Sequence, residues 1–69
     1  MQTVRIETES EADGRWIAEV PDLPGVMVYG KSRNEAIAEV EALALRIIAE
    51  RLDHGEQIPE LHQLFAVAS

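Results

Sequence analysis

Residues 16–37 constrain the fold of this chain more than any other stretch. Pro21 lacks the backbone N–H that a central strand donates, so it indicates the end of a strand. Pro24-Gly25 is the pair that the two central positions of a type II turn prefer, because proline fixes φ at about −65° and glycine tolerates a positive φ. Ser32 and Glu35 have the spacing of a capping box, which begins a helix. The stretch therefore predicts a strand, a turn, a second short strand and the start of a helix.

The neighbouring segments have strand and helix periodicity. Residues 3–9 and 15–20 alternate between apolar and polar side chains, as in strands half-buried in a sheet. Asp13-Gly14 between them predicts a hairpin with a type I′ turn, because both central positions of that turn need a positive φ. Residues 33–53 have apolar side chains at three- and four-residue spacing, which predicts a long amphipathic helix. Gly55 is placed to end that helix.

The predicted helix carries two apolar stripes. The first is the predicted core stripe: Ala36, Ile37, Val40, Leu43, Ala44, Ile47 and Ile48. The second comprises Ala38, Ala42, Leu45, Ala49 and Leu52. A second stripe of this size indicates that the helix is covered on more than one side. The strand after the Pro24-Gly25 turn is also partly apolar on both faces, with Met27 and Tyr29 opposite Val26 and Val28.

The last apolar run, Leu64–Ala68, is short and predicts a final strand. If the connection through the helix crosses over right-handed, this strand lies parallel to the first strand and beside it. The fold class is then α+β, a single β-β-β-α-β domain over residues 1–69. Its sheet has four strands in the order 3-2-1-4, with one long helix packed on one face.

The run Trp16-Ile-Ala-Glu-Val-Pro-Asp-Leu-Pro-Gly25, followed by Gly30 and by the helix start Asn34-Glu35-Ala36, resembles the HicB-type antitoxin family. The resemblance covers residues 1 to about 60. It implies a truncated ribonuclease H-like fold and a partner, a small basic RNA-cleaving toxin of the HicA type whose catalytic histidine the antitoxin covers. Many members carry a further C-terminal segment that binds DNA. Because this chain ends at Ser69, we expect that segment to be absent and expect no direct DNA binding.

Charge also favours a basic partner. The formal net charge is −7, and six of the thirteen acidic residues fall between positions 7 and 22, with Arg15 as the only basic residue among them: Glu7, Glu9, Glu11, Asp13, Glu19 and Asp22. Such a balance opposes binding to nucleic acid or to an anionic membrane. We expect Glu19, Asp22 and Leu23 to contact the partner. The alternative is that these acidic residues only keep a strand face solvated.

Nothing in the sequence predicts catalysis. There is no cysteine, and hence neither a disulfide nor thiol chemistry. His54 and His62 have no partner at the spacing of a metal or catalytic site, and Ser32 is explained as a helix cap. We therefore expect no enzyme activity, no cofactor and no metal. Neither a signal peptide nor a membrane span is recognisable, and a cytoplasmic protein is expected.

Two functions of different classes remain open. The first is an antitoxin-like protein that binds and neutralises the toxin of a type II toxin–antitoxin system. The second is a stand-alone HicB-like domain with a structural or regulatory role and no toxin. Both are compatible with self-association as a dimer or tetramer, because a chain of 69 residues has a small core. The predicted oligomer interface consists of Met27, Tyr29, Leu45 and Leu52.

Overall fold

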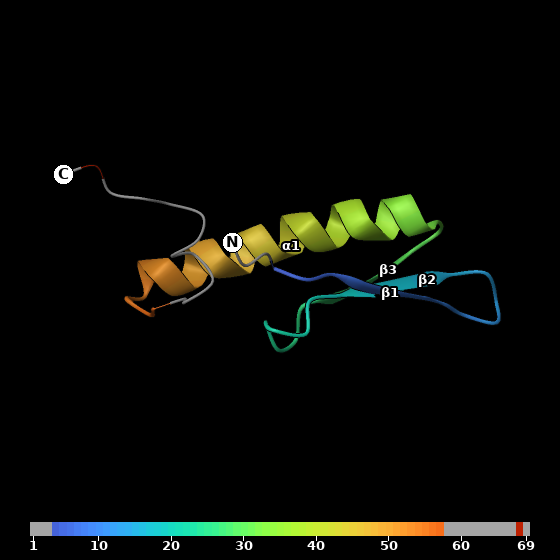
Figure 1. Cartoon of the computed structure of the whole chain (residues 1–69), viewed down its shortest axis with the longest axis horizontal. Helices are drawn as coiled ribbons and strands as arrows, with labels where there is room; N and C mark the ends of the chain where they lie inside the picture. Colours follow the sequence, from blue (N-terminus) through green and yellow to red (C-terminus); the bar gives the residue numbers. More distant parts are fainter. Residues whose placement is uncertain (1–3, 58–67, 69) are drawn as a thin grey trace.

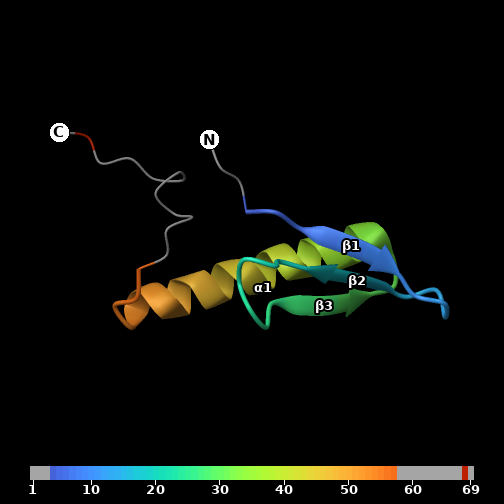
Figure 2. The same cartoon turned by 60° about the horizontal axis from the view of Figure 1, so that its bottom comes forward.

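A computed structural model describes residues 4–57 and 68 of the chain. The sheet is antiparallel, with strand order β1-β2-β3, and one helix follows it. The bounds of the elements are β1 (Glu7–Ser10), β2 (Trp16–Glu19), β3 (Met27–Gly30) and α1 (Arg33–Asp53). The helix runs along one face of the sheet and the opposite face is open (Figure 1; Figure 2). The molecule therefore has two layers.

The prediction of a four-stranded sheet with order 3-2-1-4 is wrong, because the sheet has three antiparallel strands and the fold is β-β-β-α. The predicted last strand, Leu64–Ala68, lies outside the described residues except for Ala68, which is in no strand. The prediction depended on an apolar run alone, and such a run does not establish that a segment pairs with a sheet. The 21 residues of α1 span roughly 31 Å, whereas a four-residue strand spans roughly 13 Å. The chain thus leaves the helix well past the end of the sheet. The expected truncated ribonuclease H-like fold depended on the fourth strand and is corrected with it.

Strand register explains which side chains face the helix. Ala18 in β2 pairs with Thr8 in β1 and with Val28 in β3. Ala18 is fully buried beneath the helix, and its two partners are half-buried. The Arg33 Nε donates to the Thr8 hydroxyl at 3.3 Å and so joins the first turn of the helix to β1. The predicted alternation is confirmed, although the strands are shorter than predicted.

The β1–β2 hairpin is confirmed, but its turn is not type I′. A type I′ turn needs a positive φ at both central positions, and no described residue other than glycine has one. The Gly14 N–H donates to the Glu11 carbonyl at 3.0 Å, and the Glu11 N–H donates to the Arg15 carbonyl at 2.7 Å. With Gly14 at φ 92°, this is a three-residue loop with a glycine bulge.

The Asp13 side chain explains why the loop takes this form. Its carboxylate accepts the Arg15 N–H at 3.1 Å and the Arg15 Nε at 2.8 Å. The hydrogen bond from the Arg15 backbone, helped by the guanidinium, lowers the pKa of Asp13 below its usual value of 3.8. The side chain therefore holds its own turn closed while the carboxylate is ionised.

Two consecutive turns form the β2–β3 loop. The Leu23 N–H donates to the Val20 carbonyl at 3.0 Å, and the Val26 N–H donates to the Leu23 carbonyl at 3.1 Å. The Val20 N–H donates to the Val26 carbonyl at 3.0 Å and closes the loop. Gly25 has φ 87°, so the predicted type II turn at Pro24-Gly25 is confirmed. Leu23, between the turns, is only 2% exposed and belongs to the core.

Replacing Gly25 by valine is expected to destabilise the protein by about 1–3 kcal/mol. A Cβ there would meet no atom within 4 Å, so the whole cost comes from forcing a β-branched residue to a positive φ. Thermal melts would measure the loss. Gly25→Asn is the matched control, because asparagine tolerates the left-handed region and should lose less. Equal stability of the valine variant and the wild type would contradict the argument.

Both ends of α1 are capped as predicted. The Ser32 hydroxyl accepts the Glu35 N–H at 3.1 Å, while the Glu35 carboxylate accepts the Lys31 N–H at 2.8 Å. At the other end, the Gly55 N–H donates to the Leu52 carbonyl and the Glu56 N–H to the Arg51 carbonyl, each at 3.0 Å. This pair of bonds, with Gly55 at φ 80°, is a Schellman motif. The helix bounds are thus set by local hydrogen bonds.

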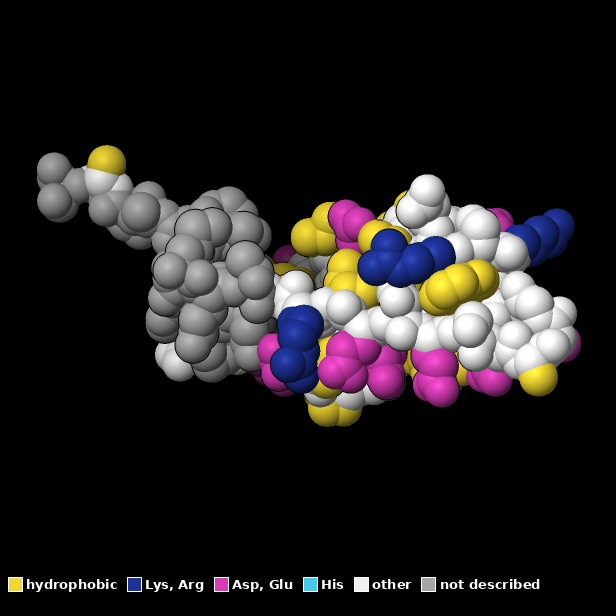
Figure 3. Space-filling view, turned by 45° about the vertical axis from the view of Figure 1, so that its right-hand side comes forward, with side chains coloured by type: hydrophobic (Ala, Val, Ile, Leu, Met, Phe, Trp, Pro, Cys, Tyr) yellow, Lys and Arg dark blue, Asp and Glu magenta, His cyan; other side chains and the backbone are white. Residues whose placement is uncertain are grey.

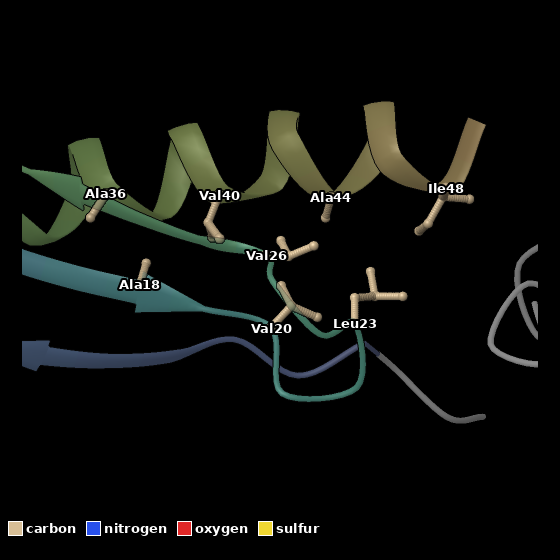
Figure 4. Packing of buried hydrophobic residues seen from close by; sticks show 8 residues of the cluster. All are labelled: Ala18, Val20, Leu23, Val26, Ala36, Val40, Ala44 and Ile48. Carbon is tan, nitrogen blue, oxygen red and sulfur yellow. The ribbon is translucent and has the colours of Figure 1, made fainter. Parts of the chain in front are cut away.

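The core lies between the helix and the sheet. Figure 4 shows side chains from α1 pointing down towards side chains from β2 and the β2–β3 loop. The buried residues are Ala18, Val20, Leu23, Val26, Ala36, Val40, Ala44 and Ile48. The remaining residues of the predicted core stripe, Ile37, Leu43 and Ile47, are half-buried. The predicted core stripe of the helix is confirmed.

Candidate protein-binding surfaces

The open face of the sheet carries three of the six clustered acidic residues. We call it the acidic face: Glu7, Glu9, Arg15, Ile17, Glu19, Met27 and Tyr29. Strand register builds it in two rows, Glu7–Glu19–Met27 and Glu9–Ile17–Tyr29. Acidic side chains gather along the lower edge of Figure 3, which is the side of the sheet in Figure 1. Three carboxylates therefore share a face with three apolar side chains.

The negative charge on this face is only partly neutralised. Glu7 and Glu19 lie directly opposite each other in the β1–β2 pair, an arrangement that is unfavourable for like charges. Arg5 pairs with Glu7 at 3.4 Å. Within residues 4–57, Glu9 and Glu19 make no ion pair. A cation brought by another molecule would relieve the repulsion between Glu7 and Glu19.

Apolar and aromatic groups adjoin these carboxylates. Met27 is 48% exposed and Tyr29 is 46% exposed. The guanidinium carbon of Arg15 lies 4.6 Å from the centre of the Tyr29 ring, a cation–π contact that holds the ring in place. The acidic face thus combines charge with apolar area, as protein interfaces do.

The structure places the three predicted partner-binding residues differently. Glu19 is exposed on the acidic face, and Asp22 is exposed on the loop at that end of the sheet. Leu23 is buried, so its side chain is not on the surface. Sequence reasoning missed that Glu7 faces Glu19. The signal that could have found this is the length of the hairpin loop, which sets the register.

The second stripe of the helix forms a separate surface, the outer ridge: Ala38, Ala42, Leu45, Ala49 and Leu52. All five side chains are exposed, Leu45 by 60% and Leu52 by 46%. At about 100° per residue, the outer ridge lies on the side of α1 opposite the buried Val40 and Ala44. In Figure 3, hydrophobic side chains reach the surface along the upper edge, the side of the helix in Figure 1.

The four predicted interface residues therefore do not form one surface. Met27 and Tyr29 lie on the acidic face, whereas Leu45 and Leu52 lie on the outer ridge, with the core between the two pairs. All four are exposed, as a contact with another chain requires. The chain has two candidate binding surfaces on opposite sides.

Other groups in the described part of the chain are engaged locally. The Nδ1 of His54 lies 2.8 Å from the Glu50 carbonyl at the end of the helix. No group of three or more histidine, aspartate or glutamate side chains within the described residues is arranged to hold a metal ion. In the same residues, no helix has the length and hydropathy needed to span a membrane.

Comparison with known proteins gives a family. No protein-family model matches the chain, and no solved structure matches it. The UPF0150 protein Ta0767 of Thermoplasma acidophilum is 34% identical to it over 59 residues, which cover 86% of this chain and 84% of that protein. Identity of this extent over nearly the whole domain shows common descent, and the chain belongs to the UPF0150 family.

Proposed function

We propose that this protein acts by binding another protein and not by catalysis, as an antitoxin-like protein that neutralises a small basic RNA-cleaving toxin of the HicA type. The observation that carries the proposal is the acidic face, where Glu7 and Glu19 oppose each other without enough cations to neutralise them. The resemblance of residues 16–37 to HicB-type antitoxins supports the same partner class. A basic protein is the ligand that such a face would bind most favourably.

Binding would proceed from long-range attraction to apolar contact. The net charge of −7 attracts a cationic partner over about 8 Å at physiological salt, which mainly raises the association rate. Met27 and Tyr29 would then lose water against the partner and slow its dissociation. Glu19 and Asp22 are the proposed charged contacts. Leu23 would act from the core by holding the loop that presents Asp22.

Neutralising Glu19 and Asp22 together is expected to slow association by about two- to tenfold at low salt and to flatten its salt dependence. The partner in the assay is a purified small basic protein encoded beside this gene. Rates for Glu19→Gln/Asp22→Asn and the wild type would be measured at two salt concentrations. Both side chains are exposed, so the fold should be retained.

Glu41→Gln/Glu50→Gln is the matched control, because it removes the same charge from exposed positions on α1. The control should slow association less than Glu19→Gln/Asp22→Asn does. Equal effects of the two double variants would mean that only net charge matters and would contradict a specific role for Glu19 and Asp22. Binding that is independent of salt would contradict the proposal as a whole.

A second candidate function is a stand-alone, self-associating domain without a toxin. The exposure of Met27, Tyr29, Leu45 and Leu52, each between 46% and 60%, favours it, because the two pairs contribute to apolar areas on two sides of the molecule and exposed apolar patches mark interaction sites. Sedimentation at micromolar concentration should show a dimer or a larger species. A monomer throughout that range, together with capture of a basic protein from the native lysate, would favour the antitoxin function alone.

A further inference from the structure

The outer ridge of α1 has the spacing of a coiled-coil seam. Its members follow one another at alternating steps of four and three residues, from Ala38 to Leu52, which matches an average repeat of about 3.5 residues. Every one of them is exposed. A helix of a two-layer protein needs only the stripe that faces the sheet to be apolar, so the outer ridge is surplus to the fold.

We propose that two copies of this chain dock through their outer ridges with the α1 helices antiparallel, so that Ala42 of one copy packs against the partner's Leu45. The inference rests on the self-association proposed above and adds its face, direction and register. The two-fold axis passes between residues 43 and 44. Around it, each Ala42 meets a leucine and each Ala38 meets the partner's Ala49. Leu52 reaches the side-chain stem of the partner's Glu35.

Charge complementarity selects this register. Glu39 and Arg46 flank the outer ridge on the same side, one heptad apart, and within residues 4–57 neither makes an ion pair. In the proposed register, Glu39 lies beside the partner's Arg46, and symmetry makes this contact twice. Sliding the helices by one heptad would instead bring Arg46 against the partner's Arg46 and Glu39 against the partner's Asp53. Repulsion between these like charges would destabilise the shifted register relative to the proposed one.

Two arguments favour the antiparallel direction over a parallel one. An antiparallel pair places small residues against large ones near the centre and keeps the distance between the helices even, whereas a parallel pair would stack alanine on alanine and leucine on leucine in turn. Antiparallel helices also align the negative end of one macrodipole with the positive end of the other. A parallel pair could form its own ion pairs between Glu41 and the partner's Arg46, so the experiment must separate the two directions.

Cysteine cross-linking separates them, because the chain has no cysteine of its own. Ala38→Cys and Ala49→Cys are prepared as two single variants of the full chain. In the proposed register, oxidation of the mixture gives a disulfide-linked dimer between positions 38 and 49. Each variant oxidised alone should give little disulfide-linked dimer. Position 38 of one copy and position 38 of the other lie eleven residues apart along the antiparallel helices, as do the two copies of position 49. This distance of about 16 Å is beyond the reach of a disulfide. Strong cross-linking of either variant alone would establish the parallel direction and overturn the proposal.

Exchanging the charges of Glu39 and Arg46, which flank the outer ridge, is an independent test. Glu39→Arg and Arg46→Glu should each raise the dimer dissociation constant by about three- to tenfold, measured by sedimentation equilibrium. The double variant should restore it, because the exchanged charges meet again across the axis. Both positions are exposed, and circular dichroism checks that the fold is kept. Loss of dimer that the double variant does not restore would overturn the register.

The outcomes also distinguish this inference from self-association itself. A dimer in sedimentation without a 38–49 cross-link in the mixture means that the chains associate through another surface and overturns only the inference. A monomer at all concentrations up to the millimolar range overturns both this inference and the self-association proposed above. The ridge contains two leucines and three alanines, so the expected dissociation constant is micromolar, roughly 1–100 μM.

Discussion

Gly30→Ala is expected to destabilise the protein by about 2–4 kcal/mol, because it adds a methyl group where the helix meets the sheet. A Cβ on Gly30 would lie 2.7 Å from the backbone nitrogen and 2.9 Å from the Cα of Ala36. These are backbone atoms of the first turn of α1, which cannot rotate away as a side chain can. The helix would have to lift from β3 and from Ala18 beneath it, or the alanine would remain in a clash.

Thermal and denaturant unfolding would measure the loss from Gly30→Ala, which corresponds to a fall of roughly 10–25 °C in Tm. Gly55→Ala is the control. Its Cβ would meet nothing within 4 Å, but Gly55 has φ 80°, so the cost of the substitution is conformational and about 1 kcal/mol. A Gly30→Ala variant no less stable than Gly55→Ala would mean that the helix moves away from the sheet at little cost.

Leu23→Ala is expected to destabilise the protein by about 2–5 kcal/mol. Leu23 is 2% exposed and is among the largest fully buried side chains of the described residues. It fills the core from the β2–β3 loop, below the part of α1 that carries Ala44 and Ile48 (Figure 4). A chain of 69 residues has a total stability of roughly 3–10 kcal/mol, so this one change would unfold a large fraction of the molecules.

Leu45→Ala makes the same chemical change on the surface, where Leu45 is 60% exposed. Its effect on unfolding should stay below about 1 kcal/mol in dilute solution. Urea melts of the two variants at the same low concentration would compare them. Equal losses would show that Leu23 is not packed in the core, and a rise in the effect of Leu45→Ala with protein concentration would report a dimer through the outer ridge.

The features that sequence predicted correctly are those set by residues close together in the chain. Gly25 needs only its own φ and the preceding proline to form a type II turn. Ser32 and Gly55 cap the helix through hydrogen bonds to residues within a few positions. The sequence predicts a type I′ turn at Asp13-Gly14, but this dipeptide fits two loop types. The choice depends on the pairing of Glu11 with Arg15, which is a property of the whole hairpin.

Features that depend on distant contacts were not predictable in this way. The apolar run Leu64–Ala68 suggested a strand, but periodicity alone cannot say whether such a run pairs with a sheet. The sequence predicts that Leu23 contacts a partner, whereas two successive turns fold its side chain into the core. Alternation along β3 and helical spacing along α1 predict the exposed apolar residues, Met27 and Tyr29 in the strand and the outer ridge on the helix. Their division into two surfaces required knowing which face of the sheet the helix covers.

The two-layer arrangement has a consequence for stoichiometry. Because α1 covers only one face of the sheet, the outer ridge and the acidic face point in opposite directions (Figure 1). A molecule bound on one therefore leaves the other open. Two chains joined along their outer ridges would hold their acidic faces on the far sides of the pair, where two basic partners could bind without touching each other. The expected complex contains two copies of each protein, and its two sites should bind with equal affinity.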